Sequence, residues 1–399
     1  MPIYFLNSKF ENLQLIKNTN IMKNMMNSFD ELIENEIREE KNKLTNINEE
    51  DNEITGFVPS PWASVGRLHS FKKYKKSGLP EKYKNEILNF NESLPLNFTI
   101  PKKIYPEILI VVDYNIYEKF EYNSTKAILY ILTFWNSVDL KFRRLENPSF
   151  SLNIVGIIFA SDENSLIYLL DNNDSNNEDE LLEKCGIFWF KYNHIIPVDS
   201  YDIVITMTSS SLPNRKLGLS YHSGACHYDN GKKIMKKIGI IQDQGGYDGI
   251  QTAVETLARL FGSNYDDERI KERNCPFNDG FIMSNRHLTI NSSDFSKCSL
   301  KDFQKFLNSN PSCLYNEPII GNKIPRYLPG KLQNHDNQCK KIEGTKSCPV
   351  PSNHIFCQQL KCIEKGSKNN CKAMTAGAAD GTLCEENSHC LHNRCIINE

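Results

Sequence analysis

Between residues 101 and 262, apolar and polar positions alternate in blocks that have the lengths of strands and helices. Four short, nearly continuous apolar runs predict buried strands, the last on a sheet edge: residues 107–113, 152–160, 201–207 and 238–243. Residues 126–137 and 252–261 instead have apolar side chains at helical spacing, and Gly262 is expected to end the second helix. The polar run 171–180 predicts a loop. Strands that alternate with helices predict an α/β layer fold.

The two ends of the chain differ from this central region. Residues 1–100 are polar and free of cysteine, with a charged helical pattern at 30–43 and an acidic, asparagine-rich stretch after it. We interpret them as a pro-region, partly disordered, with little core of its own. Residues 319–333 contain Pro and Gly and predict a linker, which leads into a small C-terminal module at residues 334–399.

Cysteines are concentrated in that module, and none of the 13 precedes Cys185. Zinc binding would need the paired C-x-x-C spacings that the module lacks, whereas a dense, even set in a short polar segment is typical of disulfides. Their connectivity is left open, but disulfides indicate an extracellular compartment. The eight cysteines of the module are Cys339, Cys348, Cys357, Cys362, Cys371, Cys384, Cys390 and Cys395.

Several other features concern location and partners. Five sequons fit a secreted glycoprotein: Asn91, Asn97, Asn123, Asn173 and Asn291. Residues 1–20 lack the basic start, apolar run and cleavage site of a signal peptide, so we expect the natural N-terminus to be missing from this sequence. No apolar run is long enough to span a membrane. Lys and Arg (47) nearly balance Asp and Glu (49), which argues against a nucleic-acid partner.

Ordered motifs within residues 102–318 carry a family resemblance. They are EILIVVD at 107–113, YDIVIT at 201–206, LGLSY at 217–221 before Cys226, GIIQD at 239–243, LFGSNYDD at 260–267, FIMS at 281–284, and Cys298 leading to CLYN at 313–316. This segment resembles the reprolysin (adamalysin-type) metalloproteases of ADAM, ADAMTS and venom proteins. The motif ADGTLC at 379–384, with Cys390 and Cys395, resembles the disintegrin-like or cysteine-rich module of ADAMTS proteins. The resemblance implies a metzincin-type domain, a twisted mixed sheet with helices, followed by a small disulfide-rich module.

Active members of this family need the motif H-E-x-x-H-x-x-G-x-x-H and a Met-turn. Three His hold zinc with one position open for water, and the Glu acts on that water as general base. When Gly262 is set on the motif's Gly, the ligand positions become Glu255, Arg259 and Tyr265, and the base becomes Thr256. No His lies between His227 and His287, so no other register restores the ligands. The sequence therefore predicts no zinc and a pseudoprotease.

The replacing side chains suit other tasks. A guanidinium has no free lone pair for a metal, a lone carboxylate is a poor site, and threonine is too weak a base. Glu255 and Arg259 are spaced by four and are expected to form an ion pair on the helix surface. Met283 occupies the Met-turn position, where we interpret it as core.

A substitute zinc site is the weaker alternative. It would be built from His222, His227 and His287, which have no recognised ligand spacing. Ordinary hydrogen-bonding histidines are the reading that we prefer.

The resemblance also implies two disulfides and a second metal site. The disulfides are Cys226–Cys313 and Cys275–Cys298, which leaves Cys185 as a free thiol or an intermolecular partner. Structural calcium would be held by Glu107, Asp202, the carbonyl of Cys313 and the side chain of Asn316. These are hard oxygen donors of the kind that Ca²⁺ takes.

Together these observations predict a secreted, reprolysin-like pseudoprotease that acts by binding an extracellular protein, which the sequence does not identify. Two alternatives stay open: an active zinc metalloendopeptidase with an atypical site, and a structural protein of the extracellular matrix.

Overall fold

The computed structural model describes residues 100–170, 177–268, 275–284, 288–309, 311–317, 326–349, 353–385 and 387–397, together with the backbone of 3–6 and 14–15. The helices are α2 (Tyr114–Lys119), α3 (Ser124–Phe142), α4 (Ile167–Leu170), α5 (Glu178–Lys191), α6 (Ile250–Leu260), α7 (Lys297–Asn308), α8 (His335–Ile342) and α9 (Asn353–Gln358). We call residues 100–317 the sheet domain and the described part of 334–399 the cysteine-rich module.

The strands fall into one large sheet and several small ones. The large sheet contains β1 (Ile3–Leu6), β2 (Gln14–Leu15), β4 (Glu107–Val112), β6 (Asn153–Ala160), β7 (Ile203–Thr208), β8 (Gly218–Ser220) and β11 (Ile238–Gln242). Two-stranded pairs join β3 (Lys103–Ile104) to β5 (Ser149–Phe150), β9 (Tyr228–Asp229) to β10 (Ile234–Met235), and β12 (Lys361–Ile363) to β13 (Cys371–Ala373). The last small sheet contains β14 (Leu383–Glu385), β15 (Ser388–Leu391) and β16 (Arg394–Ile397).

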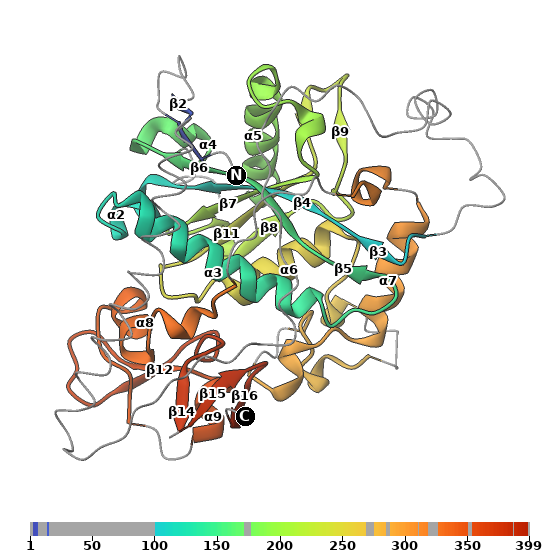
Figure 1. Ribbon diagram of the computed structural model, residues 1–399. Helices are drawn as coiled ribbons and strands as arrows, with labels where there is room; N and C mark the ends of the chain where they lie inside the picture. The colour runs from blue at the N-terminus through green and yellow to red at the C-terminus, as the bar shows by residue number, and fades with distance from the viewer. Residues whose placement is uncertain are drawn as a thin grey trace.

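The large sheet has the strand order β2-β1-β6-β4-β7-β11-β8 and is mixed. Its inner strands run parallel, while β2 and β8 at the two edges run antiparallel to their neighbours. Strand β4 is buried on both faces, as its continuous apolar run predicts. Its Ile110 belongs to the core that contains residues of α3 and α6, and its Leu109 belongs to the core that contains residues of α5. Figure 1 shows α3 and α5 on opposite sides of the sheet. The predicted α/β fold is therefore confirmed.

Three local predictions need correction. Residues 238–242 form an inner strand, β11, because the short strand β8 pairs antiparallel on its outer side. The predicted loop 171–180 ends earlier than expected, since Asn177 caps α5 and residues 178–180 form its acidic first turn. The helix expected at 126–137 extends from Ser124 to Phe142 as α3.

Strand β1 adds to the sheet a segment of the region that was interpreted as a pro-region. It pairs in parallel with β6, with Ile3 opposite Ile157 and Leu6 opposite Ala160. The rest of the region interpreted as a pro-region, including the helical pattern at 30–43, lies outside the described residues.

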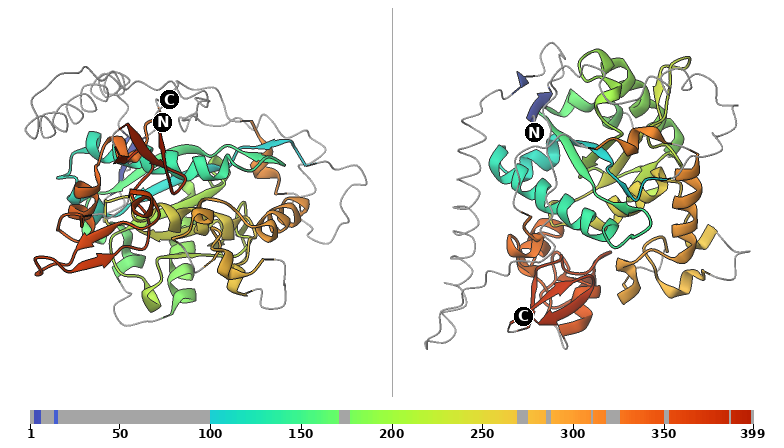
Figure 2. Two further views of the ribbon diagram at one scale, coloured as in Figure 1. Left: turned by 90° about the horizontal axis from the view of Figure 1, so that it is seen from below. Right: turned by 45° about the vertical axis from the view of Figure 1, so that its right-hand side comes forward.

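The cysteine-rich module has a small core of its own, formed largely by disulfide sulfurs around Phe356 and Leu360. It lies at the opposite end of the sheet domain from β1 (Figure 2). The segment before it is anchored to α3, where Arg326 pairs with Asp139 and the Asn136 amide donates to the carbonyl of Tyr327 at 2.9 Å. The described part of the predicted linker is thus held against the sheet domain.

Candidate functional site

Helix α6 carries three of the four positions that replace the zinc motif, and the turn after it places the fourth. Gly262 has φ of +86°, a conformation that glycine adopts without strain. Its N–H donates to the carbonyl of Arg259 at 2.9 Å, and the Ser263 N–H donates to the carbonyl of Ala258 at 2.9 Å. These two bonds form a Schellman turn, which reverses the chain and returns Tyr265 to the side of α6.

The guanidinium of Arg259 holds this site together. Its Nη1 lies 3.3 Å from Oε2 of Glu268, and its Cζ lies 4.9 Å from the centroid of the Tyr265 ring. The same Glu268 oxygen accepts a hydrogen bond from the backbone N–H of Tyr265 at 3.3 Å. A fixed cation with an aromatic and a carboxylate partner therefore occupies the position of the motif's second His.

The spacing of four between Glu255 and Arg259 predicts an ion pair on the helix surface, and the structure adds a second carboxylate, that of Glu268, beside Arg259. The turn after α6 brings Glu268 within reach of the guanidinium. The carboxyl of Glu255 is partly buried, and this burial raises its pKa to about 8, with the charge of Asp267 acting in the same direction. A hydrogen bond with Gln251 opposes this shift. At neutral pH the group is mostly the uncharged acid, which is a poor metal ligand.

The remaining two positions are also unsuited to their original tasks. Burial is the main cause that raises the pKa of the Tyr265 phenol above its usual value, so this side chain stays un-ionised. Thr256 is only 3 % exposed and has no basic group. The donor set that zinc hydrolysis requires therefore does not fit the residues present.

Met283 is fully buried in the core, beneath the segment that follows α6. Its carbonyl accepts a hydrogen bond from the N–H of Asp266 at 2.8 Å, and the Gln251 amide donates to the carbonyl of Ile282 at 3.3 Å. These bonds tie the Met-turn position to both the start and the end of the site. The scaffold around the metal position is therefore assembled, although the ligands are replaced.

Different charged groups surround the two described histidines of the substitute zinc site. Burial lowers the pKa of His222, and the charge of Arg259 lowers it further. The Nδ1 atom of His222 lies 3.1 Å from Oγ of Ser223. His227 lies near Lys236 and Asp229 instead. The third member, residue 287, lies outside the described residues.

The predicted calcium ligands lie close together near the start of β4. Glu107 and Asp202 are buried, with exposed fractions of 6 % and 4 %. The Glu107 N–H donates to Oδ2 of Asp202 at 2.8 Å, and Nδ2 of Asn316 lies 3.2 Å from Oε2 of Glu107. The backbone of Cys313 is fixed nearby by its disulfide to Cys226. Hard oxygen donors that converge in this way fit Ca²⁺.

The two carboxyl groups of this site affect each other and a nearby lysine. Burial raises the pKa of Glu107 and of Asp202, and the charge of Glu107 raises that of Asp202 further. The positive charge of Lys237 lowers the pKa of both carboxyls. Lys237 is buried, and its Nζ donates hydrogen bonds to the carbonyls of Val198 and Tyr201 at 2.6 Å. Two buried carboxyls that repel each other are suited to a cation.

The structure contains the two disulfides implied by the resemblance and pairs the cysteines that the sequence left open. Cys185 is fully buried, so it is not placed for the intermolecular bond that was one of its two predicted roles. The bonds are Cys226–Cys313, Cys275–Cys298, Cys339–Cys362, Cys348–Cys371, Cys357–Cys390 and Cys384–Cys395.

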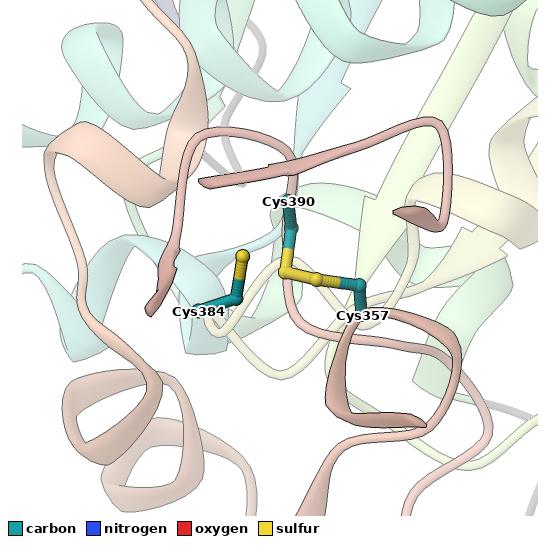
Figure 3. Close-up of side chains that lie close together, drawn as sticks. All are labelled: Cys357, Cys384 and Cys390. Carbon is teal, nitrogen blue, oxygen red and sulfur yellow. A yellow bond between two sulfur atoms is a disulfide. The ribbon is translucent and has the colours of Figure 1, made fainter. Parts of the chain in front are cut away.

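Three sulfurs of the module, those of Cys357, Cys384 and Cys390, lie within 4.8 Å of one another (Figure 3). Two are joined to each other, and the third is bonded to Cys395. A metal ligand would have to be a thiolate, so this cluster is structural.

Two residues of these sites escaped the sequence reasoning. Glu268 comes three positions after Tyr265, at the end of a 3-10 turn, and the acidic run 266–268 is the only sign of it in the sequence. Lys237 immediately precedes a buried strand, a place where a charged residue is ordinarily assumed to face solvent.

Comparisons with known proteins agree with this geometry. The model of the reprolysin (M12B) family zinc metalloproteases matches residues 104–318, and that of the ADAMTS cysteine-rich domain 2 matches residues 329–396. Among the described helices, none combines the length and the apolar character that crossing a bilayer requires.

Several curated proteins are similar to the chain. A Bombyx mori protein named "a disintegrin and metalloproteinase with thrombospondin motifs like" is 32 % identical over 317 residues, which are 74 % of this chain and 45 % of that protein. Venom metalloproteinase 3 of Eulophus pennicornis is 28 % identical over 53 % of the chain and 52 % of its own length. Human ADAMTS 16 is 26 % identical over 80 % of the chain and 25 % of its own length. The chain thus spans about half or less of these relatives.

Proposed function

Because this chain belongs to the reprolysin (M12B) metalloprotease family, we propose that it is a secreted pseudoprotease, which binds extracellular polypeptides without cleaving them. The observation that carries this proposal is Arg259, whose guanidinium lies between Glu268 and Tyr265 at the position of a zinc ligand. A guanidinium has no lone pair for a metal, and its charge repels a divalent cation.

The other replaced positions support the same conclusion. Peptide hydrolysis by this family's route needs a Lewis acid and a base that activates water. Thr256 supplies no base, Tyr265 stays a neutral phenol, and Glu255 is mostly protonated at neutral pH. No group at these positions therefore supplies either function.

The edge strand beside the altered site supports a binding role. Strand β8 is the last strand of the large sheet, and in the described chain its only sheet neighbour is β11. It lies directly over α6, since a Cβ on Gly218 would come within 2.6 Å of the side chains of both Thr252 and Thr256. An open strand edge accepts an extended polypeptide by β-augmentation, and such a ligand would cross the position of the lost metal.

Extracellular location is supported by the chemistry of the chain and by its relatives. Disulfides at this density persist in oxidising compartments. Some of the relatives are named venom metalloproteinases, and venom is a secretion. The sequons of the chain are suited to glycosylation on that route.

The test is to measure metal content and peptide hydrolysis in the purified protein. We expect well under one equivalent of zinc and no hydrolysis that a zinc chelator abolishes. One tightly bound equivalent of zinc together with chelator-sensitive cleavage would overturn the proposal in favour of an atypical active enzyme. Failure to retain any polypeptide from extracellular fluid, in a zinc-free protein, would favour a purely structural role.

We also propose that calcium binds at Glu107, Asp202, Asn316 and the carbonyl of Cys313. The ion would stabilise the fold, because it would join the start of β4 to the segment that ends the sheet domain. Its chemistry is structural and takes no part in hydrolysis.

A further inference from the structure

We propose that a pocket between the sheet domain and the cysteine-rich module binds an acidic side chain of the polypeptide held on the sheet domain. This inference rests on the proposed function and names the chemistry of its ligand. The pocket has an empty volume of about 480 Å³, open mouth included. The sheet domain contributes Lys141, Gln251 and Leu288 to its lining, and the module contributes Gln358, Ala376 and Asn393.

The buried lysine is the group that points to an acidic ligand. Lys141 belongs to α3, is only 5 % exposed and lines the pocket. Within the described part of the chain its ammonium makes one long hydrogen bond, 3.5 Å to Oγ of Ser293. An ammonium has three donors, and leaving them unsatisfied away from water is costly. Burial accordingly lowers the pKa of Lys141. A carboxylate in the pocket would satisfy these donors and favour the charged form.

Two carboxylates lie near Lys141 and act on it through space, and each also contacts another group. Asp294 forms an ion pair with Arg144. Asp380 also lines the pocket, but its Oδ1 accepts a hydrogen bond from the backbone N–H of His392 at 2.9 Å. Both acids attract Lys141 through space without a contact of hydrogen-bond length to its ammonium. The lysine is therefore the group best placed to receive a new anion.

The module side of the pocket is a fixed wall. A Cβ on Gly377 would lie 2.0 Å from the carbonyl oxygen of Cys357, so this loop packs directly against α9. Hydrogen bonds on either side hold it, from Leu360 N–H to Ala376 O at 3.0 Å and from Ala378 N–H to Phe356 O at 3.1 Å. Because this wall is already ordered, binding does not pay an entropy cost to order it.

Gln251 connects the pocket to the altered metal site. It lines the pocket, bonds to the carbonyl of Ile282 at 3.3 Å and shares a hydrogen bond with Glu255 one helical turn later. The pocket lining and the altered metal site therefore both include residues of α6. Any ligand that enters must contact both parts of the protein, so the module would take part in selecting it.

The experiment uses two libraries of short acetylated and amidated peptides on the immobilised full-length protein. One library has Glu at a fixed central position and the other has Gln there, with Asp and Glu excluded elsewhere. Retained peptides are quantified by mass spectrometry. The variant is Lys141→Met, and its matched control is Lys126→Met on the same helix, where the lysine side chain is 46 % exposed. A second variant, Ala376→Phe, narrows the pocket and leaves Lys141 in place.

We expect the wild type and Lys126→Met to retain the Glu library about tenfold better than the Gln library. Both Lys141→Met and Ala376→Phe should bring that ratio close to one, and an unchanged melting temperature of Ala376→Phe would exclude unfolding as the cause. Equal retention of the two libraries by the wild type would overturn the proposal that the pocket prefers an acidic side chain, and it would leave the proposed function standing. An acidic preference that survives in both pocket variants would also overturn it. If neither library is retained, both proposals fail.

Discussion

The sheet domain contains both the proposed calcium site and the position of the zinc motif. The two sites differ in the donor side chains that they keep. At the start of β4, Glu107 and Asp202 keep their carboxyls together in a buried place. At α6, the position of a metal ligand holds Arg259, a cation of its own. A cation lies near both sites: Lys237 acts through space on the two carboxyls of the first, whereas Arg259 occupies a ligand position of the second. A cation paired to a carboxylate and an aromatic ring thus occupies one of the ligand positions of the zinc motif.

The strongest way to break this comparison is to restore the ligands. The variant Glu255→His, Thr256→Glu, Arg259→His and Tyr265→His should bind close to one equivalent of zinc, because α6, the Gly262 turn and Met283 still place these positions. Proteolysis should be weak, since the groups that orient ligand histidines are missing. Elemental analysis and peptide hydrolysis measure both effects. A folded variant without zinc would show that the site has changed beyond its ligands.

The calcium position offers the next largest effect. At calcium concentrations about a hundredfold above its Kd, the wild type should gain about 2.7 kcal/mol of unfolding free energy, a rise in melting temperature of roughly 5–10 °C. The variant Asp202→Asn should lose most of that rise, because a buried anionic ligand is gone. Differential scanning calorimetry with and without a calcium chelator measures it. A wild type that does not respond to calcium would remove the contrast between the two sites.

The pH dependence of the unfolding free energy tests whether Glu255 is protonated in the folded protein. Its pKa is raised to about 8 in the folded protein, so the folded state binds more protons than the unfolded state between about pH 4.5 and 8. Its stabilising contribution is fully present below about pH 4.5 and is lost as the pH rises through 8, with a slope of up to about 1.4 kcal/mol per pH unit. Denaturant unfolding of Glu255→Gln should show a flatter pH profile than the wild type. Parallel profiles would mean that Glu255 is ionised in the folded state.

The smallest expected effect concerns Arg259 itself. Replacing it by Met should cost about 1 kcal/mol, since the ion pair with Glu268 is partly exposed and the contact with Tyr265 adds a modest amount. Glu268→Gln, which keeps the contact with Tyr265, should cost less. Urea unfolding of both variants tests the order, and a larger loss in Glu268→Gln would assign the stabilisation to the carboxylate instead.

The sequence predicted what depends on local pattern and missed what depends on contacts between distant segments. The apolar runs of β4, β6 and β7 and the stop at Gly262 could be read directly, and the motif alignment located Glu255, Arg259 and Tyr265. The contact of Arg259 with Glu268 could not be predicted from helical spacing, because it depends on the turn after α6. Strand β8 is three residues long, too short to show a period, so β11 was placed wrongly on an edge.

The pairing of β1 with β6 has a consequence for any processing of this chain. After a cut between residues 15 and 100, the backbone ladder between β1 and β6, from Ile3 opposite Ile157 to Leu6 opposite Ala160, would be the attachment that the described residues provide. The product is then a two-chain protein whose small N-terminal peptide travels with the large chain in native separations and leaves it under denaturing ones. Loss of the peptide would expose the row of N–H and C=O groups along β6. Such a bare strand recruits whatever extended chain it meets, including a second copy of the same protein.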